Sequence, residues 1–255
     1  MQPLSTAGAP LWRARITSPA AMWLMVALTL LFAAMRALGL LGPHPLRWML
    51  PLSFTAMMLA PWILLSAAGR RRIGLTPPPS RLARKAYPVA ILCGAAAALV
   101  CFLTGLALFG HGADNWYVSI ADNYRATLDT SHFSIPTLYL IFTAPALLFS
   151  PIGEEIFFRG MLQRSLEQSF STRASTIIEC AAFGLIHLCH HGLALDATGL
   201  MMRPLSGALW FGLMFSTALL FATIRRRSGS LYPAMAAHAA FNAVMNAVIF
   251  AFLWR

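Results

Sequence analysis

Apolar residues occur along the chain in long runs, separated by short segments rich in proline, glycine, serine or charged residues. Most runs approach or exceed the roughly 20 residues that a helix needs to cross the hydrocarbon core of a bilayer. The breaks at 42–45, 77–79 and 228–230 contain the residue types that mark turns and loops. The pattern therefore predicts about seven transmembrane helices, in the runs 20–41, 48–68, 87–109, 136–163, 174–190, 205–224 and 231–253.

The composition excludes a soluble globular protein. The 255 residues are 58% hydrophobic and 11% charged, whereas soluble domains are about 45–50% apolar and about 25% charged. A disordered or collagen-like chain would need many more polar or Gly/Pro residues. We therefore expect an all-α polytopic transmembrane helix bundle, with a single transmembrane domain over 20–253 after a cytoplasmic tail over 1–19. The first run has no persuasive cleavage site, which favours a retained helix over a signal peptide.

The basic residues predict the orientation of this bundle. The chain has 19 Lys or Arg and 8 Asp or Glu, a formal net charge of +11, and basic residues accumulate in the cytoplasmic loops of membrane proteins. That rule explains the excess of basic residues, so nucleic acid is not expected as a partner. The expected partner is the lipid bilayer. With a cytoplasmic N-terminus, the basic residues on the cytoplasmic side are Arg13, Arg15, Arg70, Arg71, Arg72, Arg81, Arg84, Lys85, Arg164, Arg173, Arg225, Arg226 and Arg227. The external ones are Arg47, Arg125, Arg203 and Arg255, and Arg36 and Arg159 lie at membrane depth.

The four cysteines predict no disulfide framework. Cys93, Cys101, Cys180 and Cys189 lie inside or at the ends of apolar runs rather than in evenly spaced loops. We expect free thiols that pack as small hydrophobic side chains.

Two adjacent glutamates lie within the fourth apolar run, where a charged side chain is costly unless it is paired or faces a polar cavity. Glu155 and Arg159 are four residues apart, so they share a helix face and are expected to form an ion pair. Glu154 has no such partner on its own helix. The sequence therefore predicts that Glu155 is neutralised and oriented by Arg159, and that Glu154 is left to act as a general base.

Two histidines in other runs complete the candidate chemistry. Phe183 and His187 are four residues apart, as are His238 and Asn242, so each pair lies on one helix face. A carboxylate and two imidazoles from three helices can meet in one cavity, where they would bind a water or a metal ion. Asn242 is placed to donate a hydrogen bond to a developing oxyanion. The depths of these residues in their helices predict a polar cavity open toward the cytoplasm.

Together these motifs resemble a known family of membrane peptidases. Glu-Glu-x-x-x-Arg (154, 155, 159), Phe-x-x-x-His (183, 187) and His-x-x-x-Asn (238, 242) are similar to the three motifs of the CPBP family. This family comprises the CAAX-protease and bacteriocin-processing intramembrane endopeptidases, also called Abi proteins. The resemblance covers 136–250, which would be the catalytic core, and it implies a glutamic-type protease of a bacterial inner membrane.

The resemblance also implies roles for the motif residues. Glu154 with His187 would activate a water that attacks a peptide carbonyl, and His238 with Asn242 would stabilise the tetrahedral oxyanion. Glu155, Arg159 and Phe183 would hold the site or orient the substrate, a membrane-associated protein or peptide, lipidated or not. A Glu/His pair needs no cofactor, and the zinc-helix signature His-Glu-x-x-His is absent, so zinc is disfavoured; its ligands would be Glu154, His187 and His238.

Two other functions stay open at this point. The chain would be a catalytically silent member of the same fold that acts as an immunity or scaffold protein, or a small proton-coupled transporter that uses the two glutamates. The absence of an evident repeat between the halves counts against many transporter architectures.

Further polar residues have simpler expected roles. We expect His190 and His191 to be solvated in an external loop, Arg36 to extend to the outer membrane surface, and Asn246 to serve helix packing. For Glu179 two roles stay open: it extends the polar cavity, or it pairs with Arg173 near the membrane surface.

Overall fold

The computed structural model describes residues 11–13, 18–80, 84–196 and 199–254. Most of the predicted tail 1–19, together with Arg15, Arg81 and Arg255 of the charge distribution, lies outside these residues. The α-helices are α1 (Ser18–Leu41), α2 (Met49–Leu64), α3 (Ala67–Arg72), α5 (Ala86–Phe109), α6 (Trp116–Thr127), α7 (Ile135–Glu154), α8 (Gln163–Leu166), α9 (Thr172–Ile186), α10 (Pro204–Ser228) and α11 (Tyr232–Val248).

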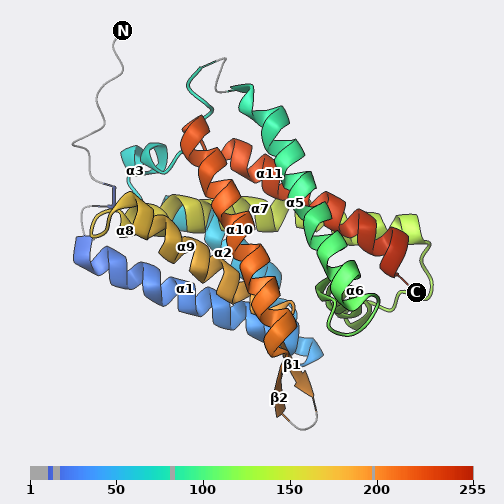
Figure 1. Ribbon diagram of the computed structural model, residues 1–255. Helices are drawn as coiled ribbons and strands as arrows, with labels where there is room; N and C mark the ends of the chain where they lie inside the picture. Colours follow the sequence, from blue (N-terminus) through green and yellow to red (C-terminus); the bar gives the residue numbers. More distant parts are fainter. Residues whose placement is uncertain (1–10, 14–17, 81–83, 197–198, 255) are drawn as a thin grey trace.

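Figure 1 shows how these helices are arranged; short segments of other geometry interrupt or extend them. Two are 3₁₀ turns, η2 (His44–Leu46) and η4 (His187–Cys189), and two are π-helical, η3 (Glu155–Leu162) and η5 (Ile249–Leu253). Strands β1 (Leu193–Asp196) and β2 (Gly199–Met202) form an antiparallel hairpin in which Leu193 pairs with Met202. The predicted helix bundle is thus correct, with one small hairpin added.

Within the described residues, five helical segments are long and apolar enough to cross a membrane. They are Pro19–Leu41, Ala86–Phe109, Ile135–Leu166, Pro204–Ser228 and Tyr232–Leu253. The predicted number of about seven is not confirmed, because the helices in the other two apolar runs, α2 and α9, have 16 and 15 residues. The protein is a multi-pass helical membrane protein, and its orientation stays a prediction.

Two hydrophobic cores divide the bundle. One is built mainly from α1, α2, η3 and α9 and includes Phe54 and Phe183. The other is built mainly from α5, α6, α10 and α11 and includes Phe221 and Phe241. Side chains of both cores line the cavity described below, so this cavity lies where the two halves of the bundle meet.

Two glycines set how closely helices approach next to the candidate site. A Cβ at Gly94 in α5 would collide with the carbonyl oxygen of Ala237 in α11, one residue before His238. A Cβ at Gly153 in α7 would lie 2.7 Å from the carbonyl oxygen of Phe54 in α2, one residue before Glu154. The close backbone contacts that hold these two chemistry-bearing residues in place therefore require glycine.

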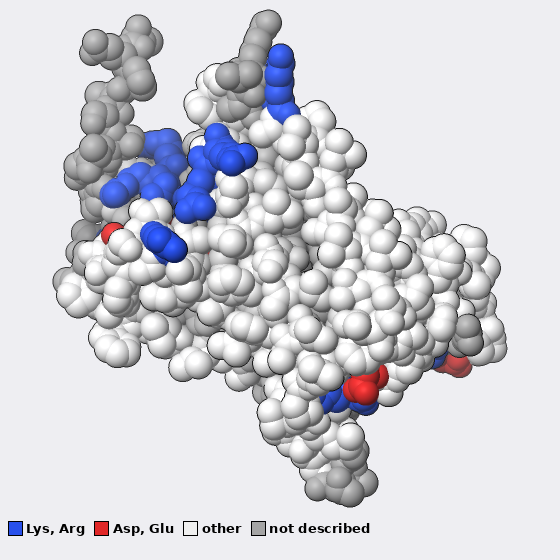
Figure 2. Space-filling view, viewed as in Figure 1, with Lys and Arg blue, Asp and Glu red and all other residues white. Residues whose placement is uncertain are grey.

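Charged side chains are distributed unevenly between the two ends of the bundle. In Figure 2 the arginines and lysines gather near α3, α8 and the C-terminal end of α10, and most of the visible acidic groups lie near the opposite end. The last turns of α3 and α10 carry Arg70 to Arg72 and Arg225 to Arg227. We call this the basic end. The four cysteines are free, as expected.

Candidate active site

The two adjacent glutamates lie at a change of helix geometry. Glu154 is the last residue of α7 and Glu155 is the first residue of the π-helical segment η3. Both side chains are fully buried, at 0% exposure. Such π segments are frequent at functional sites, and this one places the two carboxylates beside different helices.

Glu154 has a cation partner on another helix, which the spacing of residues on its own helix did not predict. Its Oε1 accepts a short hydrogen bond from Nη2 of Arg36 in α1. Its Oε2 accepts from the Ser150 hydroxyl at 3.3 Å and lies 3.6 Å from Nε2 of His238. The expectation for Arg36 was wrong, because this side chain is fully buried against Glu154 instead of extending to the membrane surface.

His187 has a defined tautomer. Its Nδ1 lies 2.6 Å from the carbonyl oxygen of Phe183. A carbonyl only accepts, so Nδ1 carries the proton and Nε2 is an acceptor. This Nε2 lies 3.3 Å from Nη1 of Arg36. Arg36 therefore bridges Glu154 and His187, the two residues expected to act together on a water.

His238 of α11 lies next to both glutamates. Its Nδ1 lies 2.9 Å from Oε1 of Glu155, which orients the ring by a charge-assisted hydrogen bond. Its Nε2 faces Ser150 Oγ at 3.4 Å and Oε2 of Glu154. The ring stacks on Phe221 with centroids 5.1 Å apart. Glu155 thus positions His238 so that its second nitrogen faces Glu154.

The predicted pair of Glu155 and Arg159 is confirmed, with Nε and Oε2 3.3 Å apart. Arg159 also lies 3.4 Å from Oε1 of Glu179. Glu179 thus pairs with Arg159 and not with Arg173, and it is not among the residues that line the cavity, so both expectations for Glu179 were wrong. The guanidinium lies over the Phe183 ring at 4.0 Å. All three side chains are fully buried, so Arg159 is a cation enclosed by two carboxylates and an aromatic face.

The two asparagines of α11 hold this helix against α7. Asn242 Nδ2 donates to the carbonyl oxygen of Ala146 at 2.9 Å, and the side chain lines the cavity. Asn246 Nδ2 donates to Thr143 Oγ1 at 3.0 Å, while its Oδ1 accepts from the Tyr124 hydroxyl at 2.9 Å. Asn246 packs helices together, as expected.

A cavity of about 540 Å³ adjoins the polar cluster. Arg36, Ser150, His187 and His238 form its polar wall, and most of the remaining lining is apolar. The lining extends along α7 and α11 to the α6 residues 120, 123, 124 and 127, whereas α6 lies far from the basic end (Figure 1). Arg159 and Glu179 are packed on the other side of the cluster. The cavity therefore extends away from the basic end. Since the basic end is the side predicted to face the cytoplasm, this arrangement disagrees with the expected opening toward the cytoplasm.

One comparison with known proteins identifies the segment that carries these residues. Residues 136–244 match the family model of the Rce1-like type II CAAX prenyl endopeptidases. This part of the chain is similar to the CAAX-protease family. The match contains all seven motif residues and nearly coincides with the expected core over 136–250. No significant match was found among curated proteins or among solved structures.

The matched segment does not contain the whole site. Arg36 in α1 and the cavity-lining residues of α2 and α6 lie outside the matched segment. The sequence reasoning missed the role of Arg36, although an arginine within an apolar helix is a signal of function. It also missed Ser150, which precedes Glu154 by one helix turn and contacts both Glu154 and His238.

The two histidines after η4 are not solvated, contrary to the expectation. His190 lines the cavity, with its ring 5.4 Å from that of His187. His191 is buried between the hydroxyls of Ser119 in α6 and Ser206 in α10, at 2.8 and 2.9 Å. Burial, with a smaller effect of Arg203, lowers the pKa of His191 to about 4, so this ring is neutral at pH 7 and joins two helices.

Two of the three candidate metal ligands, Glu154 and His187, lie next to the positively charged Arg36. Among the residues that the structure describes, no group of three or more His, Cys, Asp or Glu is arranged to hold a metal ion. Glu154 and His187 both contact the guanidinium of Arg36, and His238 lies on the other side of Glu154.

Coupling between Arg36 and Glu154 gives a first testable result. Arg36→Ala leaves the Glu154 carboxylate buried without its cation, so we expect it to lower the free energy of unfolding. In the double variant with Glu154→Gln no unpaired carboxylate is left behind. Its loss of unfolding free energy should therefore be smaller than the sum of the two single losses by about 0.5–3 kcal/mol. Denaturant unfolding of the four proteins in one detergent measures this coupling. Strictly additive losses would show that the pair does not interact.

Proposed function

We propose that this protein is an intramembrane endopeptidase that hydrolyses a peptide bond of a membrane-associated protein or peptide. The observation that carries the proposal is the fully buried Glu154 carboxylate, which lies directly behind the polar wall of a large apolar cavity and contacts three residues of that wall, Arg36, Ser150 and His238. The similarity of residues 136–244 to the Rce1-like type II CAAX prenyl endopeptidases supports the same reaction class.

In the proposed reaction Glu154 acts as a general base toward a water in the cavity. The water oxygen bonds to the carbonyl carbon of the substrate while Glu154 takes one water proton. The carbonyl π bond opens to a tetrahedral oxyanion. When the C–N bond breaks, the proton held by Glu154 passes to the leaving nitrogen, which gives a carboxylic acid and an amine. This sequence returns Glu154 to its starting state.

Arg36 and Ser150 are well placed to hold the base in position. One Glu154 oxygen is bonded to Arg36 and the other to Ser150, so the carboxylate is restrained from two sides. A restrained carboxylate loses less freedom when the reaction begins, which favours catalysis. Arg36 and Ser150 are thus proposed as positioning residues. The acceptor Nε2 of His187 faces the same Arg36 guanidinium as Glu154, and His187 is proposed to help orient the water.

His238 and Asn242 are proposed to stabilise the oxyanion. Both side chains line the cavity from α11, and Glu155 fixes the orientation of His238. Asn242 has two amide hydrogens, of which the bond to Ala146 uses one. Preorganised donors of this kind contribute a large part of catalysis in acyl transfer.

The cavity favours an apolar substrate segment. Its volume of about 540 Å³ lies within the usual range of ligand sites, about 300–1,000 Å³. Among the described lining residues, the charged and imidazole groups lie together on one wall, formed by Arg36, His187, His190 and His238. We propose that an apolar stretch of the substrate, or a lipid attached to it, fills the cavity and brings the peptide bond to Glu154. Cleavage of paired synthetic peptides, lipidated and not lipidated, by the reconstituted protein tests this proposal; cleavage of neither peptide while natural membrane proteins are cleaved would contradict it.

We expect activity without a metal ion. The Arg36 guanidinium already supplies a positive charge to Glu154 and His187, two of the three side chains that would ligate a metal. Cleavage by the reconstituted protein should therefore change less than twofold after dialysis against a strong chelator. Elemental analysis of the same sample gives the control. Loss of activity that returns specifically with added zinc would contradict a metal-free mechanism.

A further inference from the structure

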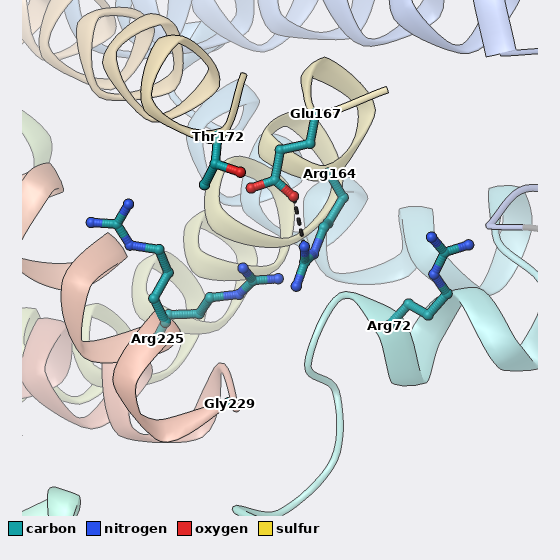
Figure 3. Close-up of a pocket in the computed structure, with 7 residues that line it drawn as sticks. Arg72, Arg164, Glu167, Thr172, Arg225 and Gly229 are labelled. Carbon is teal, nitrogen blue, oxygen red and sulfur yellow. Dashed lines mark hydrogen bonds and ion pairs between the residues drawn. The ribbon is translucent and has the colours of Figure 1, made fainter. Parts of the chain in front are cut away.

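A second pocket, separate from the cavity, lies at the basic end of the bundle (Figure 3). Its volume is about 160 Å³. Arginines from three elements line it: Arg72 of α3, Arg164 of α8, and Arg225 with Arg226 of α10. Elements far apart in the sequence thus bring four guanidinium groups around one small volume.

The positive charge of this pocket is only partly neutralised. Glu167 is the one acidic residue in the lining, and its carboxylate accepts from Arg164 at 2.6 Å. Three net positive charges therefore remain among the lining residues. Like charges held this close repel one another, and a bound anion would relieve that repulsion.

Arg225 is the least explained member of the cluster. Its side chain is 3% exposed, yet within the described part of the chain no carboxylate lies close enough to form an ion pair with it. Its Nη2 donates to the carbonyl oxygen of Ile73 at 3.2 Å, which is a neutral partner. Nε of Arg164 is also buried without a hydrogen-bond partner among the described residues. A cation that is almost fully buried and makes no ion pair indicates a place for an anionic ligand.

We propose that this pocket binds a phosphate group, supplied by the head group of an anionic phospholipid. Guanidinium groups bind phosphate oxygens in pairs with matched geometry. The volume is close to that of cavities that accept a benzene-sized molecule, about 150 Å³, so it holds a phosphate with part of its ester substituent. The basic end is also the end that the positive-inside rule assigns to the cytoplasmic leaflet, whose surface carries anionic lipids.

A ligand in this pocket would connect α8, α9 and α10. Arg226 Nη1 donates to Thr176 Oγ1 at 3.4 Å, and the same hydroxyl accepts from Gln163 Nε2 at 3.1 Å. Thr176 lies in α9, one turn before Glu179. Occupancy of the pocket would therefore stabilise α8, α9 and α10 against one another, and thermal stability reports on binding.

The test titrates purified full-length protein in a non-ionic detergent and follows the midpoint of thermal unfolding. The probes are short-chain phosphatidylglycerol, short-chain phosphatidylcholine, inorganic phosphate, and sodium chloride at matched ionic strength. Arg226→Gln removes a lining charge. Arg227→Gln is the matched control, because this exposed neighbour on α10 is not part of the lining. We expect phosphatidylglycerol to raise the midpoint saturably in the wild type and in Arg227→Gln, and Arg226→Gln to need at least tenfold more lipid.

Each remaining outcome decides the question. Saturation by inorganic phosphate with the same dependence on Arg226 would support the phosphate site and identify free phosphate as a sufficient ligand. Saturation by phosphatidylglycerol alone would identify the lipid. No saturable shift, or equal weakening by Arg226→Gln and Arg227→Gln, would overturn the proposal in favour of a diffuse basic surface. If Arg226→Gln does not fold, Arg164→Gln takes its place with the same control.

Discussion

Glu154→Gln is expected to abolish peptide-bond cleavage by the reconstituted protein, with a loss of at least about 10²–10⁴-fold. The amide keeps the shape of the carboxylate and its contact with Ser150, but it cannot take a proton from water. Cleavage of a membrane-anchored peptide, followed by mass spectrometry of the products, gives the rate. Because the substitution also removes the charge next to Arg36, the unfolding midpoint is measured on the same samples.

Asp129→Asn is the matched control for this result. It makes the same change from carboxylate to amide at an exposed side chain that lines neither the cavity nor the second pocket. We expect its cleavage rate to stay within about twofold of the wild type. His187→Ala should also remove activity while leaving a folded, membrane-inserted protein. Retained cleavage in both Glu154→Gln and His187→Ala would end the assignment of these residues to catalysis.

Arg159→Ala is expected to give the largest loss of stability, about 3–5 kcal/mol. Glu155 and Glu179 both lie next to its guanidinium, and all three side chains are fully buried. Removal of the cation therefore leaves two carboxylates close together without compensation. Denaturant unfolding in detergent measures the free energy, and cleavage should fall as well, because Glu155 orients His238.

Arg173→Ala provides the comparison for Arg159→Ala. Arg173 is exposed at the start of α9, and surface substitutions of this kind change stability by about 0.5 kcal/mol or less. If Arg159→Ala is as stable as Arg173→Ala, the buried network of Arg159 with the two glutamates does not contribute as its geometry indicates.

Local spacing was sufficient to predict the contacts made within one turn of helix. The four-residue spacing of Glu155 and Arg159 predicted their ion pair, which the structure contains. The same rule placed Phe183 next to His187, and the carbonyl of Phe183 indeed fixes the tautomer of that ring. Such contacts depend on helix geometry alone, so they can be read from the sequence.

Contacts between distant helices were not predictable in the same way. Arg36 and Glu154 are separated by 118 positions, and no periodicity in the sequence relates α1 to α7. Glu179 was expected either to extend the polar cavity or to pair with Arg173, because its helix face was known but the neighbouring helix was not; its partner is Arg159. His191 was assigned to solvent because it follows an apolar run, whereas the chain after η4 folds back between α6 and α10 and buries it.

The number of spans shows a related limit. An apolar run indicates burial, and burial by lipid and burial by protein give the same composition. Runs 48–68 and 174–190 form the 16-residue helix α2 and the 15-residue helix α9. Both contribute residues to the protein core around the site, Phe54 from α2 and Phe183 from α9. Apolar character therefore predicted the helices but not how each is buried.

The most direct test of the central claim compares the protein termini in membranes of cells that carry wild-type protein, Glu154→Gln or Asp129→Asn. Mass spectrometry of carboxyl-terminal peptides detects each new chain end that hydrolysis creates. If Glu154 activates water in the cavity, at least one such terminus is present with the wild type and with Asp129→Asn and missing with Glu154→Gln. Identical sets of termini in all three membranes, with equal protein levels, would contradict a hydrolytic role for this site.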